Sequence, residues 1–110
     1  MATEKKMTVD QGSRYQIVID VTGMDLAGYS ARGMVRRTRI DPDVLADWAA
    51  YLSVNPVDKQ VVLVVPGDVT KTYDFDSARY DIEVYQPGSP EASAERILQG
   101  DVHLDREVTR

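Results

Sequence analysis

The chain of 110 residues is long enough for one domain with a single hydrophobic core and too short for two ordinary domains. With 43% apolar and 28% charged residues the composition is typical of a globular protein, and the absence of cysteine excludes disulfides, thiolate catalysis and cysteine zinc sites. The net charge of −5 is unevenly distributed, because residues 1–40 carry seven basic and four acidic side chains whereas residues 41–110 carry six and fourteen. This asymmetry suits charge-complementary packing between copies or with partners.

The N-terminal segment MATEKKMTVDQG is polar and has no hydrophobic period. We therefore predict that residues 1–12 form a flexible arm, which becomes ordered only against a partner, and that residues 13–110 form the single domain. The polar start is not a secretory signal, and no apolar run approaches the roughly 20 residues of a membrane helix. We expect no membrane partner.

Two strands are expected after the arm. Residues 14–21, RYQIVIDV, alternate apolar and polar side chains, which is the period of a strand with one buried face. A turn bracketed by Gly23 and Gly28 follows. Residues 29–39, YSARGMVRRTR, then lie between two turns, so we predict a second strand with Gly33 at a bulge or a point of close approach.

A helical spacing follows in DVLADWAAYLS, residues 43–53. Apolar residues from Val44 to Leu52 recur at intervals of three and four, Asp43 can cap the start, and Asn55-Pro56 can end the helix. The pattern predicts one short connecting helix that plugs one end of a sheet.

The remaining elements are predicted to be strands. The unbroken apolar run KQVVLVV, residues 59–65, is typical of a strand covered on both sides. Residues 80–85 and 97–104 alternate around the turn QPGSPEASA and predict a hairpin with a long loop, and EVTR at residues 107–110 can add a last edge. Short strands with turn signals about every ten residues favour an all-β, immunoglobulin-like antiparallel sandwich, with a small partly open barrel as the alternative.

Candidate catalytic and metal-binding residues are sparse. His103 is the only histidine, and a base or a zinc ligand needs partners around the imidazole ring. The close carboxylate pairs are Asp41/Asp43, Asp74/Asp76 and Asp81/Glu83. A calcium loop needs more ligands at fixed offsets than DFDSARYDIE supplies. No nucleophile elbow, phosphate loop or dinucleotide motif occurs, so we predict a protein that is not an enzyme and has no catalytic, cofactor-binding or metal-binding residues and no cofactor.

The basic residues concentrate in one segment, at Arg32, Arg36, Arg37 and Arg39. Nucleic-acid binding would need aromatic stacking platforms and a basic protein, whereas this chain is acidic with one Phe and one Trp. We therefore expect no nucleic-acid partner. Instead we expect Arg32 and Arg36 to pair with Asp81 or Glu83, across strands or across a subunit boundary. Trp48 and Tyr51 are expected to plug the core rather than to bind a ligand.

Four motifs occur in a characteristic order. A Gly-aromatic step at residues 28–29 leads into a strand that ends at Arg36, and YDIE follows at residues 80–83. RILQGDV occupies residues 96–102, and Val-Thr closes the series at residues 108–109. In this order and spacing, from residue 13 to residue 110, the chain resembles the small β-sandwich proteins of tailed-bacteriophage tail tips and baseplates. The nearest group is the tail-collar and long-tail-fibre-associated sandwich family. The acidic connection at residues 41–56 departs from the family pattern.

The resemblance implies a structural role in the virion. Members of the family associate with copies of themselves around the tail tube or tail tip and hold fibres or neighbouring baseplate parts. The implied partners are further copies in a ring or array, tail-tube and tail-tip proteins, and tail fibres; the implied location is the phage tail, after assembly in the host cytoplasm. The alternatives are a head-associated or decoration protein with the same fold, or a ligand- or metal-binding module outside phages that uses Asp74, Asp76 and Asp81.

Overall fold

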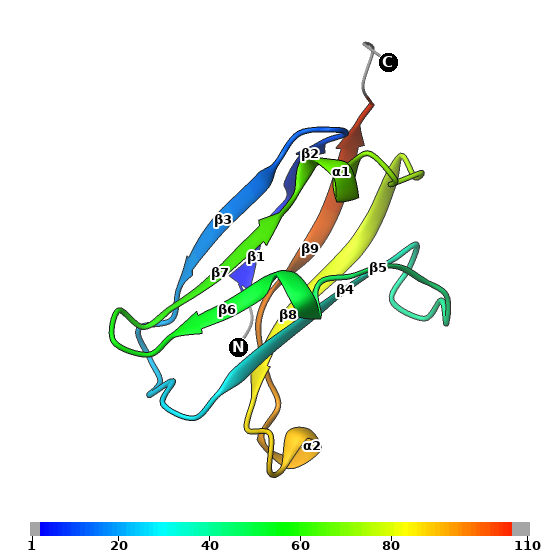
Figure 1. Ribbon diagram of the computed structural model, residues 1–110. Coiled ribbons are helices and arrows are strands. Elements are labelled where there is room, and N and C mark those ends of the chain that lie inside the picture. Colours follow the sequence, from blue (N-terminus) through cyan, green and yellow to red (C-terminus); the bar gives the residue numbers. More distant parts are fainter. Residues whose placement is uncertain (1–2, 107–110) are drawn as a thin grey trace.

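Residues 3–106, which are the residues that the structure describes, form two packed β-sheets in a computed structural model (Figure 1). In the larger sheet, β1 (Thr3–Glu4) and β2 (Met7–Asp10) pair one after the other along β9 (Glu95–Asp105), which is followed by β8 (Ser77–Tyr85), β4 (Ser30–Arg36) and β5 (Val44–Asp47). The smaller sheet has the order β3 (Tyr15–Asp20), β7 (Gln60–Val65) and β6 (Leu52–Asn55). The helical elements are a 3₁₀ turn at Ala49–Tyr51, α1 (Gly67–Thr70) and α2 (Pro90–Ser93).

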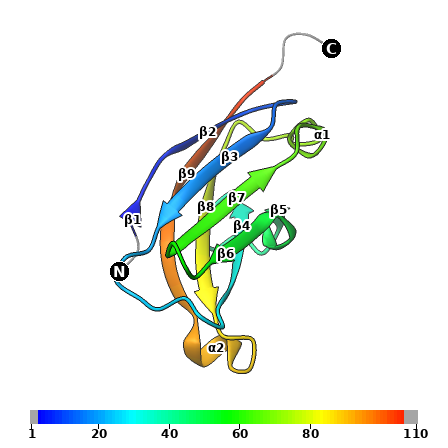
Figure 2. The ribbon, with the colours of Figure 1, turned by 60° about the vertical axis from the view of Figure 1, so that its left-hand side comes forward.

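The prediction of an all-β fold with two layers is confirmed, and Figure 2 shows the smaller sheet lying across the larger one. Within residues 3–106, no strand pair joins the two sheets, so the alternative of a partly open barrel is wrong. The five predicted strands appear as β3, β4, β7, β8 and β9, and β8 pairs antiparallel with β9 as expected for the hairpin.

The core lies between the sheets and is built from every second residue of the long strands. In β7, Val61, Leu63 and Val65 are buried, whereas Val62 and Val64 on the other side are half-buried. The prediction that β7 is covered on both sides is therefore wrong. Its continuous apolar run buries one face in the core and leaves the other face on the outside of the smaller sheet.

The predicted helix at residues 43–53 is also wrong. This segment forms β5, the 3₁₀ turn and β6, and it passes from the larger sheet to the smaller one. Its buried side chains, Ala46 and Trp48, are two residues apart, which is a strand period rather than a helical one. Pairing of β5 with β4 and of β6 with β7 satisfies the backbone hydrogen bonds that a helix would have made.

The N-terminal residues belong to the sheet. The expectation of a flexible arm fails for residues 3–10, because β1 and β2 pair in parallel with β9 and the side chains of Met7 and Val9 are only 1% exposed. The two apolar residues are too few to give a hydrophobic period, yet each fills a place in the core. The predicted edge at residues 107–110 lies outside the described residues.

Lys5 connects β1 to β2 and lies against Gly100 of β9. A Cβ atom on Gly100 would come within 2.3 Å of the Lys5 carbonyl oxygen, so a larger residue would push the N-terminal segment away from the sheet. That oxygen also accepts a hydrogen bond of 2.5 Å from the Tyr80 hydroxyl group. None of the helices within residues 3–106 is long and apolar enough to cross a bilayer.

Candidate functional site

The outer face of the larger sheet carries the chain's main concentration of paired charges. Side chains of β8 alternate, so Tyr80, Ile82 and Val84 are buried in the core while Arg79, Asp81 and others point outward. The register places Arg32 of β4 opposite Glu83, and Asp81 opposite Gln99 of β9. Strand alternation and register together therefore build a lattice of arginines and carboxylates across three strands.

This face is hollowed. A hollow of about 400 Å³, which we call the arginine hollow, lies over β4, β8 and β9 and the connection that follows β4. Its arginines are Arg32, Arg36, Arg39, Arg79 and Arg96. Its carboxylates are Asp81 and Glu83. Positive groups therefore exceed negative groups in the lining, although the whole chain has a net charge of −5.

A β-bulge places Arg96 in the hollow. Leu98 pairs with Ile82, but the next pair joins Arg96 with Glu83, so Ile97 is the extra residue of the bulge. Without the bulge, Arg96 would lie on the same side as Leu98 and face the core. The extra residue turns Arg96 to the outer face instead, which is a common use of bulges.

At one end of the hollow, Arg32 is held by several groups. Its Nε atom donates a short hydrogen bond to Glu83, its Nη2 atom lies 3.6 Å from Glu91, and its guanidinium carbon lies 4.7 Å from the centre of the Tyr85 ring. The hydrogen bond to Glu83 is the main cause of a pKa raised above the ordinary value for arginine. The predicted pairing of Arg32 with Glu83 is confirmed.

Asp81 lies in the middle of the hollow. The Arg96 Nε atom is 3.6 Å from Asp81 Oδ2, and Arg96 Nη1 donates to Gln99 Oε1 at 3.1 Å. Partial burial raises the pKa of Asp81 above its ordinary value, although the nearby guanidinium groups, Arg96 first, act in the opposite direction. The desolvation of this carboxylate therefore outweighs its attraction to arginine.

Glu4 joins the N-terminal strand to the other end of the hollow. One oxygen, Oε1, accepts a hydrogen bond of 3.0 Å from Gln99, lies 3.7 Å from Arg79 Nη2 and lies 3.9 Å from Arg39 Nη2. Arg79 also donates a hydrogen bond of 2.9 Å to Asp101, which raises the pKa of this arginine. A single carboxylate oxygen thus accepts one hydrogen bond, from Gln99, and lies within ion-pair distance of Arg79 and Arg39.

Arg36 has a different environment. Its Nη1 atom donates to the main-chain oxygen of Asp41 at 3.0 Å, and its Nη2 atom lies 3.5 Å from the sulfur of Met34. Among the described residues, no carboxylate lies within ion-pair distance of Arg36, so its expected pairing with Asp81 or Glu83 is not formed. The main-chain contact nevertheless fixes the guanidinium group at the edge of the hollow.

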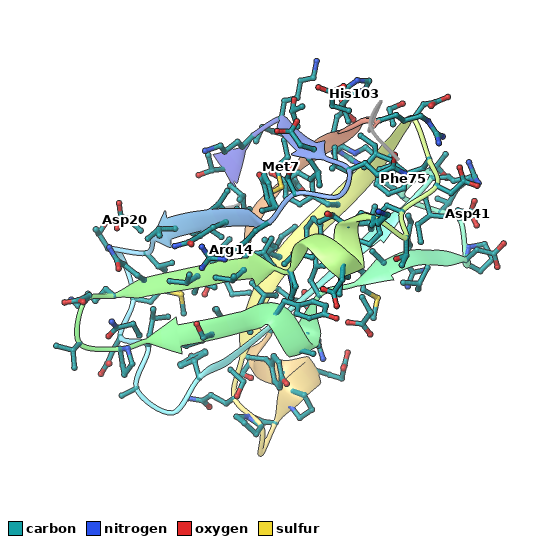
Figure 3. The ribbon with its side chains drawn as sticks, turned by 45° about the horizontal axis from the view of Figure 1, so that its top comes forward. Met7, Arg14, Asp20, Asp41, Phe75 and His103 are labelled. Atoms are coloured by element: carbon teal, nitrogen blue, oxygen red, sulfur yellow. The ribbon has the colours of Figure 1, made fainter. Side chains whose placement is uncertain are left out.

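The predicted candidate residues do not gather at one place. Asp74 and Asp76 each lie 3.1 Å from Arg106 and thus form ion pairs in the connection before β8, whereas Asp81 faces the hollow. Within residues 3–106, no three histidine or acidic side chains come together as metal ligands. His103 is exposed on β9, and Asp41, whose Oδ1 accepts from the Asp43 amide, lies far from it (Figure 3).

Trp48 occupies the core, as expected. Its side chain is 1% exposed, its Nε1 atom donates to the Tyr73 hydroxyl oxygen at 2.9 Å, and its ring lies 6.0 Å from that of Tyr80. Tyr51 is half-buried beside this core. The exposed Arg37 does not line the hollow, so only part of the predicted basic segment contributes to it.

Two arginines that line the hollow and one carboxylate that contacts its lining residues were not predicted. Arg79 could have been found, because it shares the outward period of Asp81 and Glu83 in β8. The outward position of Arg96 depends on a β-bulge that no residue type in the sequence indicates. Glu4 lies in the segment that was predicted to be an arm. Side chains from the beginning, middle and end of the chain therefore meet on this face.

No protein-family model matches the chain, and no curated protein is significantly similar to it in sequence.

Proposed function

We propose that this protein is a structural component of a tailed-phage virion: a tail-tip or baseplate collar or fibre-attachment module. It assembles around the tail tube and links the tube to fibres or neighbouring baseplate proteins. The observation that carries the proposal is the placement of the motifs that resemble phage sandwich proteins. The segment at residues 28–36 leads into β4, and those at residues 80–83 and 96–102 fall on β8 and β9; the three strands are neighbours in one sheet.

The shared surface explains how separate motifs can serve one role. Their arginines and carboxylates meet as the lattice on the outer face, and the hollow lies among them. Complementary charges at fixed positions set register and orientation between protein neighbours more than they add affinity. An assembly part needs such positional specificity.

The finer topology that we propose is immunoglobulin-like. The order β9-β8-β4-β5 against β3-β7-β6 supports it, because variable-type immunoglobulin domains divide their strands between two sheets in this way. The parallel strand β2 adds a further edge to β9. A sandwich with unpaired outer edges has main-chain groups to offer to neighbours in an assembly.

The test of the proposal is the position of the protein in a particle. Gold-labelled antibody against the chain, applied to virions of the phage that encodes it and viewed by electron microscopy, should mark the tail tip. Antibody pre-absorbed with purified protein is the control and should mark nothing. Label on the capsid would favour a head-associated protein of the same fold, and virions that lack the chain would overturn the proposal.

A further inference from the structure

The arginine hollow has spare capacity for anions at one end. Arg32, Arg79 and Arg96 each lie near a carboxylate, but Arg36 contacts only a main-chain oxygen and a sulfur within the described part of the chain. Arg39 is 70% exposed, and its only carboxylate there is the shared oxygen of Glu4 at 3.9 Å. A guanidinium group has five N–H donors, so both side chains keep donors for another carboxylate.

The opposite side of the molecule carries two carboxylates whose hydrogen-bond partners within residues 3–106 are amides, although the exposed Lys59 lies in the same turn as Asp58. Asp20 ends β3, and it faces Gln60 at the start of β7. Asp58 lies in the turn between β6 and β7, where its partner is the Asn55 amide. Neither Asp20 nor Asp58 forms an ion pair with any residue in the range 3–106, and we call the two carboxylates and this turn the acidic tip.

The two features cannot meet within one molecule. Figure 3 shows Asp20 at one side of the structure and Asp41, whose carbonyl holds Arg36, at the other. Two hollows would repel each other, as would two acidic tips. Hollow must therefore meet tip. When the tip of one copy meets the hollow of the next without a reciprocal second contact, the interface is heterologous, and it leaves one free hollow and one free tip that can each bind a further copy.

We propose that copies of this chain associate head to tail, with the acidic tip of one copy seated at the Arg36 and Arg39 end of the arginine hollow of the next. The inference rests on the proposed function in one respect, since it specifies the self-association expected of a ring or array. A nucleic acid is a poorer occupant, because Asp81 and Glu83 within the hollow would repel a continuous line of phosphates.

Sedimentation velocity on the purified full chain at low and high salt tests the contact. Wild-type protein should form oligomers that dissociate at high salt, because salt screens exposed charges. The double variant Arg36→Glu/Arg39→Glu and the double variant Asp20→Arg/Asp58→Arg should each weaken association by at least about tenfold. Arg37→Glu is the matched control for the first variant: it reverses the same charge in the same segment outside the hollow and should still associate.

Mixing the two double variants provides the sharper test. The hollow of each variant is then opposite in charge to the tip of the other. Oligomers that contain both variants should therefore form in the mixture. Circular dichroism and thermal unfolding establish that each variant is folded. A wild type that stays monomeric at low salt would overturn the inference, as would a mixture of folded variants that fails to associate.

These results are separable from the location of the chain in virions. If the chain marks the tail tip and the Arg36→Glu/Arg39→Glu variant associates like the wild type, the proposed function stands and the head-to-tail contact is wrong. If the mixture associates and the chain is absent from virions, the contact stands and the proposed function is wrong.

Discussion

The two outer faces of the sandwich are built from the same strand alternation but have opposite chemistry. On the larger sheet, outward positions of β4, β8 and β9 hold arginines and carboxylates that pair across strands around a hollow. On the smaller sheet, Val18 of β3 lies opposite Val62 of β7, and Val18 is 49% exposed. The charged face is therefore suited to contacts that depend on charge and position, whereas the valine face has exposed apolar area, whose burial is non-directional.

The largest loss of stability is expected from a change in the core between the two sheets. Trp48→Ala removes a buried indole that contacts both the Tyr73 hydroxyl group and the Tyr80 ring, so we expect a loss of about 3–5 kcal/mol in the free energy of unfolding. Urea denaturation followed by circular dichroism measures it. Trp48→Phe fills more of the space and should lose less; equal losses would contradict the expected role of side-chain volume.

The next effect concerns β2, the N-terminal strand that directly follows Glu4 and Lys5 and pairs with β9. Met7→Ala should lower the free energy of unfolding by about 2–5 kcal/mol, because Met7 is only 1% exposed and its truncation leaves a cavity. Thr8→Ala, at the exposed neighbouring position, should change it by about 0.5 kcal/mol or less. If the two variants were equally stable in chemical denaturation, the N-terminal residues would be an arm after all.

A smaller effect is expected within the charged face. Arg32 and Glu83 are 29% and 22% exposed in their side chains, so solvent screens their pair only in part. A double-mutant cycle with Arg32→Ala and Glu83→Ala should give a coupling energy of about 0.5–1 kcal/mol. The same cycle on Arg106 and the 87%-exposed Asp74 should give a weaker coupling. A stronger coupling for the exposed pair would show that partial burial is not what strengthens these contacts.

The smallest effect is a pH dependence at Asp81. Burial raises its pKa in the folded state above the unfolded value, so the folded state binds the proton more tightly. As pH falls from above the raised pKa toward the ordinary pKa of 3.8, wild type should therefore gain stability relative to Asp81→Asn. Thermal unfolding of both proteins across this range measures the difference. A relative loss of wild-type stability on acidification would mean that attraction to Arg96 dominates.

The strands were predictable from the sequence where apolar and polar residues alternate clearly. Alternation in residues 14–21 and in the hairpin predicted β3, β8 and β9, because a one-sided strand needs a period of two. Residues 43–53 were misread, since spacings of three and four also arise by chance in a short segment whose backbone is paired on two different sheets. The pairing of residues 3–10 with β9 could not be predicted, because only Met7 and Val9 are buried there.

Only one contact of the candidate site, between side chains on neighbouring strands, was predictable from the sequence. The pairing of Arg32 with Glu83 followed from residue types and from the expectation that their strands are neighbours. The rest of the charged face depends on three further features: the bulge at Ile97, the pairing of the strand that carries Glu4 with β9, and the main-chain contact that holds Arg36. Each depends on the three-dimensional position of backbone atoms, which the spacing of residues in the sequence does not indicate.

The parallel pairing of β2 with β9 also governs how the domain bears tension. A force that pulls the start of β2 and the end of β9 apart acts on the two strands in opposite directions along their common axis. The hydrogen bonds of the four register pairs, from Met7–Val102 to Asp10–Asp105, are then loaded together in shear instead of opening one after another. In the proposed role as a link between tube and fibre, this arrangement would add mechanical resistance, because forced unfolding is governed by the unfolding rate and these register pairs would have to break together.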